Sequence, residues 1–200
     1  MRVATATIPP PQPSSAPKVT IMNIDIVNSW LEASIREIST QAHFADIAHR
    51  NINKKSASQF DTAFTSIHSF LSHCAMVSKM LKGEYRVEYS NYTKVITMGK
   101  VLGIPKSSVI HNRKFRNYLE HYDTEIQKWV NKHHNDNIGT YNIGPKAAFN
   151  GIVYISHYDP TSDTYTFVNK DLGLAPLHKE TLNIKKLADG WVAQQQGRPI

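Results

Sequence analysis

The chain has almost no cysteine and no long hydrophobic run. Cys74 is the single cysteine among 200 residues, so no disulfide can form within one chain. Its apolar neighbours predict a small buried residue rather than a reactive thiol. No apolar stretch reaches about 18 residues, and no basic start precedes an apolar block, so we expect neither a transmembrane helix nor a secretory signal. The reducing cytoplasm is the expected compartment.

Several common catalytic and cofactor-binding patterns are also missing. The sequence contains no glycine-rich phosphate loop, no serine nucleophile elbow and no dinucleotide fingerprint. Its 10 histidines are not spaced with cysteines or acids in the way metal ligands are. His133 and His134 are adjacent, and their rings would point apart on a helix. The sequence therefore predicts no metal and no cofactor.

Basic residues outnumber acidic ones. The chain has 23 lysines and arginines against 16 aspartates and glutamates, a formal net charge of +7. Its pI is near 9.4 and its mean hydropathy is −0.40. Such a charge favours a polyanionic partner such as RNA, DNA or a membrane surface. Lysines scattered over a surface without any such partner are the alternative interpretation.

Apolar residues recur at helical spacing through the first 140 residues. The spacing predicts helices over about 25–51, 58–82, 95–102 and 113–130. Four helical segments with short links are typical of an up-and-down bundle, which we expect to span 21–140. The fold class is therefore predicted to be mainly α.

The two ends of the chain differ in composition from this helical part. Residues 1–20 are rich in proline, serine and alanine, which predicts a disordered tail. Within 141–200, the segments 151–158 and 164–168 are rich in β-formers and are separated by turn residues, which predicts a β-hairpin. A short terminal helix is expected over 183–194. Because an isolated hairpin is marginally stable, this region should pack on the bundle.

Arg116 and His121 are the most informative pair in the chain. Arginine can hold a phosphate through two hydrogen bonds, and histidine can give or take a proton near neutral pH. Together they could bind and cleave a phosphodiester without a metal. On one helix their side chains lie about 140° apart and do not converge. A symmetric dimer could bring Arg116 of one chain towards His121 of the other.

Polar neighbours of the pair complete the candidate site. Asn117 can hold the imidazole or donate to a phosphate oxygen, which makes it a third catalytic candidate. In the alternative interpretation, Arg116 only pairs with the glutamate four positions later, and His121 makes a structural hydrogen bond. The candidate substrate-binding residues are Arg113, Lys114, Glu120 and Tyr122.

The pair and its flanks resemble the Arg-polar-three-residues-His motif of the HEPN superfamily. The segments 102–105, 113–117 and 120–123, together with Trp129, are similar to a bacterial HEPN-like group. In that group we expect an Arg-Asn, Glu-His, Phe-Asp-Glu-Arg pattern closed by a tryptophan. Tyr122 stands where phenylalanine is usual. The sequence also has Thr-Glu at 124–125 in place of Glu-Arg, which removes a cation from the pattern.

The resemblance implies a small helical domain, because HEPN proteins are such domains and many are metal-independent ribonucleases. It further implies a homodimeric endoribonuclease of a toxin or defence type, with RNA as substrate and a cognate antitoxin as a partner. The same fold also serves non-catalytic modules that bind RNA, a nucleotide or a partner protein, so a binding module is the second hypothesis. A third is a structural accessory protein whose hairpin docks on another subunit.

Overall fold

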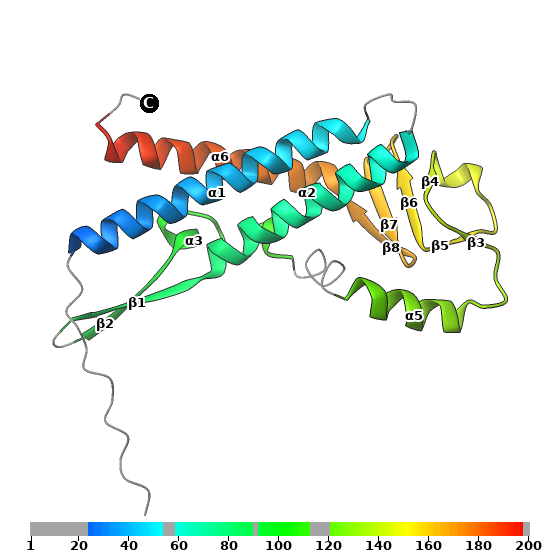
Figure 1. Ribbon diagram of the computed structural model, residues 1–200, viewed down its shortest axis with the longest axis horizontal. Coiled ribbons are helices and arrows are strands. Elements are labelled where there is room, and N and C mark those ends of the chain that lie inside the picture. The colour runs from blue at the N-terminus through cyan, green and yellow to red at the C-terminus, as the bar shows by residue number, and fades with distance from the viewer. Residues whose placement is uncertain (1–23, 54–58, 90–91, 113–120, 198–200) are drawn as a thin grey trace, which may run out of the picture.

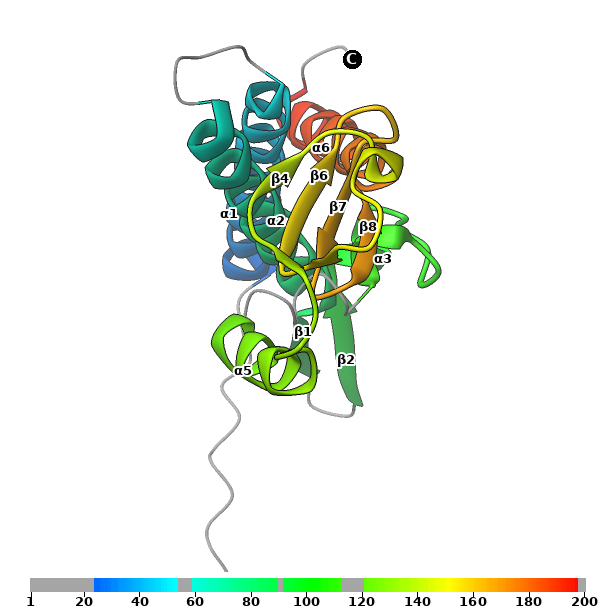
Figure 2. The same cartoon turned by 90° about the vertical axis from the view of Figure 1, so that its right-hand side faces the viewer.

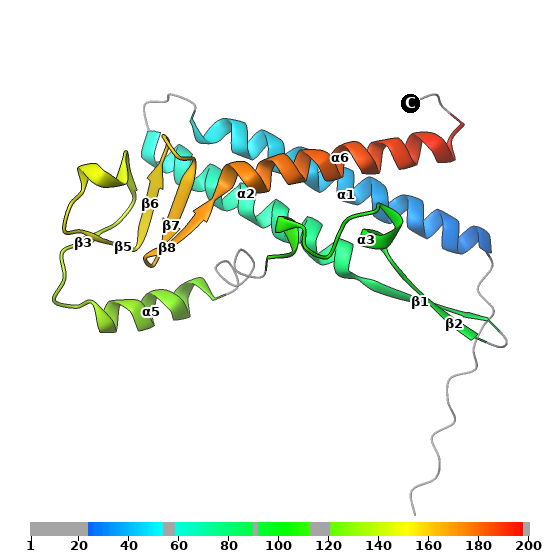
Figure 3. The same ribbon diagram turned by 180° about the vertical axis from the view of Figure 1, so that it is seen from behind.

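Three long helices form the main body of the molecule (Figure 1). They are α1 (Ile24–Ile52), α2 (Gln59–Lys82) and α6 (Leu174–Gln195). α1 and α2 run in opposite directions, and α6 lies along α1 (Figure 3). The computed structural model describes residues 24–53, 59–89, 92–112 and 121–197. The expected tail over 1–20 lies outside these ranges.

The long helices share one apolar core. On α1, the buried residues Ile35, Ile38, Ala42 and Ala45 follow the three-four spacing of a helix face that packs on its neighbours. They belong to one cluster with buried residues of α2 and α6. Small alanines on this face allow the neighbouring helices to approach α1 closely.

A four-stranded mixed sheet lies at one end of the helices (Figure 2). Its strand order is β4 (Asn142–Ile143), β6 (Ser156–Asp159), β7 (Thr164–Phe167) and β8 (Lys170–Gly173). Strand β7 is antiparallel to both β6 and β8, whereas β4 is parallel to β6. Tyr158, Tyr165, Phe167 and Leu172 join the helical core from one face of this sheet.

Smaller elements surround this body. The hairpin of β1 (Glu84–Tyr89) and β2 (Tyr92–Thr97) continues from the end of α2. The short helix α3 (Met98–Val101) and the 3-10 turn η1 (Val109–His111) follow it. Helix α5 (Tyr122–Lys132) lies below the sheet in Figure 1, and its Trp129 belongs to the shared core cluster. A parallel pair, β3 (Ile138–Gly139) and β5 (Val153–Tyr154), borders the sheet.

The prediction of an up-and-down helical bundle is wrong. Helical periodicity reports that a helix buries one face, but it does not report what covers that face. Here α1 and α2 are covered by α6 and by the sheet, both from the last third of the chain. The predicted hairpin does form, as the antiparallel pair β6–β7, but it is part of a mixed four-stranded sheet.

Two helix predictions also need correction. The expected terminal helix over 183–194 is the second half of α6, which has 22 residues. Pro176 lies in its first turn, where a missing backbone N–H costs nothing. The expected helix over 95–102 begins too early, because residues 95–97 belong to β2, where the β-branched Val95, Ile96 and Thr97 favour a strand. The helix does form over the four residues of α3, Met98–Val101.

Cys74 behaves as a buried apolar residue, as predicted. Its Sγ atom lies 3.5 Å from Oγ1 of Thr181 on α6. Burial raises the pKa of the Cys74 thiol to about 12, so the reactive thiolate does not form at neutral pH. None of the described helices has the length and apolar composition that a membrane-spanning helix needs.

Candidate functional site

His121 is the member of the predicted Arg–His pair that the structure describes. It is the N-cap residue of α5, its side chain is exposed, and it makes no capping hydrogen bond. The ring has no hydrogen-bond partner among the described residues, so a substrate can reach it. The remaining predicted residues lie outside the described residues: Arg113, Lys114, Arg116, Asn117, Glu120 and the side chain of Tyr122.

Helix α5 is tied to the sheet through Glu125. The Nζ atom of Lys170, on β8, lies 3.3 Å from Oε2 of Glu125, and Lys128 lies 3.7 Å from Oε1. The hydrogen bond from Lys170 lowers the pKa of the Glu125 carboxyl. Glu125 occupies the position where the HEPN-like pattern has arginine. The glutamate found here pairs with a lysine of the sheet.

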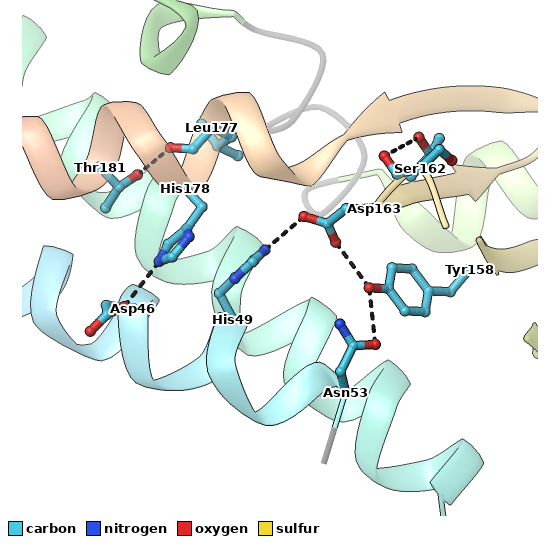
Figure 4. Close-up of polar contacts among 10 residues, drawn as sticks. Asp46, His49, Asn53, Tyr158, Ser162, Asp163, Leu177, His178 and Thr181 are labelled. Atoms are coloured by element: carbon cyan, nitrogen blue, oxygen red, sulfur yellow. Dashed lines mark hydrogen bonds and ion pairs between the residues drawn. The ribbon is translucent and has the colours of Figure 1, made fainter. Parts of the chain in front are cut away.

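A second polar cluster forms where α1, α6 and the β6–β7 turn meet (Figure 4). Nε2 of His49 lies 2.9 Å from Oδ2 of Asp163, and Nε2 of His178 lies 2.9 Å from Oδ1 of Asp46. The two imidazoles stack with centroids 3.9 Å apart and planes 16° apart. We call these four residues the His–Asp network.

Tyr158 extends the His–Asp network to the sheet. Its hydroxyl lies 2.9 Å from Oδ1 of Asp163 and 3.3 Å from Oδ1 of Asn53. A hydroxyl has one hydrogen and donates to one of these oxygens at a time. Burial and the neighbouring Asp163 carboxylate raise the pKa of Tyr158 above its usual value, so the hydroxyl stays protonated.

Both carboxylates of the network are stabilised in the ionised form. Burial acts to raise the pKa of Asp163, but hydrogen bonds from His49 and Tyr158 outweigh it and lower the pKa. Burial likewise opposes ionisation of Asp46, and its contacts with His178 and Arg50 lower the pKa nevertheless. Ionised carboxylates fix the orientation of the two rings.

The His–Asp network has the hydrogen-bond arrangement of a general base. Its side chains are as buried as those of a structural contact. A carboxylate-held imidazole can accept a proton on its other nitrogen, as in catalytic triads. The side chains of His49 and His178 are only 16% and 18% exposed, however. The rings face each other, and Phe70 packs edge-on against His49 at 5.1 Å. We therefore interpret the network as the polar contact that fixes α1, α6 and the sheet in place.

The opposite face of the sheet carries a row of polar residues. Asn142, His157, Thr166 and Asp171 occupy directly paired positions on the four strands. Thr166 donates to Oδ1 of Asp171 at 2.6 Å. His157 is fully buried, and neither of its ring nitrogens makes a hydrogen bond. Burial lowers the pKa of His157, so the ring is neutral.

These clusters do not form a metal site. Within the ranges that the structure describes, no three side chains of histidine, cysteine, aspartate or glutamate converge as metal ligands would. In the His–Asp network, each Nε2 atom is already bound to a carboxylate.

Comparisons with known proteins give this chain no family. No family model matches it. A search of curated proteins and a search of solved structures also found no match. Its function therefore has to be inferred from its own residues.

The sequence prediction missed His49 and His178. Asp46 and His49 lie three positions apart on α1, and Asn53 follows four positions later, directly after the helix ends. This polar spacing was the only local signal for the cluster. The partners of His49 and Asp46 are 114 and 132 positions away in the chain. No local pattern points to residues so distant, and they meet only when α6 and the β6–β7 turn pack on α1.

Proposed function

We propose that the protein is a metal-independent endoribonuclease of HEPN type, with Arg116 and His121 as its catalytic pair. The observation that supports this most directly is the exposed imidazole of His121, which has no partner among the described residues. It stands at the start of α5, five positions after the arginine of the motif. The resemblance of the flanking segments and the net charge of +7 add support.

In the proposed reaction, the 2′-hydroxyl of the substrate RNA attacks the adjacent phosphorus. A new P–O bond forms, the bond to the 5′-oxygen of the next nucleotide breaks, and the products carry a 2′,3′-cyclic phosphate and a 5′-hydroxyl. His121 moves the proton from the 2′-hydroxyl towards the departing 5′-oxygen, which contributes about 10²–10⁴-fold. Arg116 stabilises the charge that develops on the phosphoryl oxygens. Asn117 orients the imidazole.

We place this chemistry in a cytoplasmic homodimer. The 140° separation expected on one continuous helix does not apply, because α5 begins directly after His121. We keep the homodimer as part of the proposal, in which a two-fold axis would join Arg116 of one chain to His121 of its partner. Arg113 and Lys114 would bind flanking phosphates, and Glu120 and Tyr122 would border the substrate. A cognate antitoxin would be the protein that restrains the activity.

Cleavage of an end-labelled RNA tests the catalytic pair. We expect the wild type to release products ending in 2′,3′-cyclic phosphate in the presence of a chelator, because no metal takes part. His121→Ala and Arg116→Ala should each lower the rate at least about 100-fold. His43→Ala, which removes an exposed histidine of α1, should have no effect. Equal cleavage by the wild type and both variants of the pair would refute the proposal.

Mixing the two inactive variants tests the shared site. In a dimer formed from Arg116→Ala and His121→Ala chains, one of the two sites would regain both residues if each site draws on both chains. Random pairing puts half of the chains in such dimers, so the mixture should recover about a quarter of the wild-type rate. If each chain supplied its own pair, every site would remain defective. No recovery would therefore refute the shared site.

A non-catalytic RNA-binding module is the second candidate. The basic character of the chain favours it without requiring the Arg–His pair to act. In that case, RNA would bind in a salt-dependent manner and would remain intact with the wild type. The cleavage experiment above separates the two functions.

A further inference from the structure

A cavity of about 400 Å³ opens between the end of α2, the hairpin β1–β2, α3 and the turn η1. Apolar side chains of Leu81, Val95 and Ile104 form part of its wall. Its volume lies within the range of ordinary small-molecule sites, which are mostly apolar with a few polar groups.

Gly99 keeps the wall of this cavity close to α2. A Cβ atom added at Gly99 would lie 3.0 Å from the carbonyl oxygen of Leu81. A larger residue would therefore push α3 away from α2, and the space between them would change shape.

Positive charge is concentrated at this cavity. Its lining includes Lys82, Lys100 and Lys106 against one carboxylate, that of Glu84. The same lining includes His111, whose pKa is lowered by burial and by the charge of Lys82, so the ring adds no charge at neutral pH. The formal balance of these groups is three positive charges against one negative.

One of the three lysines makes a structural contact. Lys82 lies at the C-terminal end of α2, where a cation is favourable, and it donates to the carbonyl oxygen of His111 at 3.0 Å. Lys100 and Lys106 are exposed and form no ion pair with any described residue. The single carboxylate of Glu84 leaves an excess of positive charge here. Like charges in excess of their counter-charges repel each other, and a bound anion relieves that repulsion.

We propose that this cavity binds one nucleotide of an RNA strand. The base would lie against Val95 and Ile104, and the phosphates on either side would bind Lys100 and Lys106. Apolar walls suit the face of a base, and ammonium groups suit phosphates. This deepens, and in part rests on, the proposed function, because the same strand would continue to the Arg–His pair. His111 precedes Arg116 by five residues, which span at most about 18 Å.

Binding of a 2′-O-methyl RNA hexamer, followed by fluorescence anisotropy, tests the cavity. This RNA lacks the attacking hydroxyl, so its binding is measured whether or not the protein cleaves RNA. We expect Lys100→Ala/Lys106→Ala to weaken binding roughly tenfold at low salt. The slope of log Kd against log salt should fall by about 1.4, which corresponds to two phosphate contacts on a single strand.

A matched variant separates the site from general charge. Lys179→Ala/Lys186→Ala removes two exposed lysines of α6 that do not line the cavity, and it should weaken binding no more than about twofold. Val95→Ser should weaken binding and leave the salt slope unchanged, because it removes an exposed apolar contact and no charge. Equal losses in the two double variants would overturn the proposal. The cleavage test would be unaffected by that result.

Discussion

At the scale of single residues, His157 is the least expected side chain in the fold. It is fully buried, and both ring nitrogens lack a hydrogen bond. An unsatisfied buried polar group costs about 1–3 kcal/mol. The ring is held among aromatic neighbours, with Tyr154 at 4.5 Å and Phe149 at 5.6 Å between centroids. Packing with these rings offsets part of that cost.

Replacing His157 with phenylalanine should not destabilise the protein. His157→Phe keeps a ring among its aromatic neighbours and removes two unsatisfied nitrogens. We expect the free energy of unfolding in urea to stay the same or rise by about 1 kcal/mol. Thr166→Val, at the paired position on β7, breaks a hydrogen bond to Asp171 and should cost about 1–3 kcal/mol. A loss above about 1 kcal/mol in His157→Phe would contradict this account.

At the scale of elements, the His–Asp network joins α1, α6 and the sheet. Apolar packing alone would not fix the positions of these elements along one another. Apolar contacts are non-directional, whereas the bonds from His49 and Tyr158 to Asp163 have fixed geometry. The network therefore sets how far α6 and the sheet lie along α1. Buried polar contacts of this kind are worth most when each member is satisfied.

Tyr158→Phe should measure the contribution of this contact. The variant keeps the buried ring and removes the hydroxyl that Asp163 and Asn53 share. We expect a loss of about 1–2 kcal/mol in the free energy of unfolding. Tyr141→Phe removes a hydroxyl from a half-exposed tyrosine with no hydrogen-bond partner among the described residues, and it should change stability by less than about 0.5 kcal/mol. Equal effects of the two variants would argue against the network.

The sequence predicts the elements of this fold better than their arrangement. The apolar stripes of α1 and α2 are continuous over many turns, so both helices were predicted within a few residues. The start of α6, which contains Pro176, was not predicted, and the helix expected over 95–102 forms only over 98–101 because residues 95–97 are in β2. Strand β4 pairs with β6, and α6 packs on α1, through contacts between residues that are far apart in the sequence. No local sequence pattern predicts such contacts.

The same limit applies to the candidate sites. The Arg–His pair was found because its members are close in the sequence and have an obvious chemical use. The residues of the cavity come from α2, β1, β2, α3 and η1. In the sequence, each lysine of the cavity (Lys82, Lys100 and Lys106) is an ordinary surface charge. Only the fold brings the three together.

At the scale of the whole molecule, stability should fall as the pH drops below neutral. Burial lowers the pKa of both His68 and His157, so the folded state binds these protons less readily than the unfolded chain. The contribution of these two histidines to the free energy of unfolding is fully present above their pKa in the unfolded chain, about 6.5. It is lost as the pH falls towards their lower pKa values in the folded state. Because the pKa values of Asp46 and Asp163 are also lowered in the folded state, protonation of these carboxylates at more acidic pH lowers the free energy of unfolding further.

Urea unfolding at pH 7.5, 6.5 and 5.5 measures this dependence. We expect the free energy of unfolding to decrease from the first pH to the last, and to decrease less in His157→Phe, which lacks one of the titrating groups. A constant or rising stability between pH 7.5 and 5.5 would contradict the assignment of neutral buried histidines.

The position of α6 against α1 has a consequence for how the protein is made. The side of α1 that α6 covers stays bare on the ribosome until residues 174–195 have been synthesised. At about 5–20 residues per second, the intervening 53–173 take roughly 6–25 s to translate. During this interval a nascent α1 presents apolar surface to the cell, and transiently exposed surface of this kind promotes aggregation.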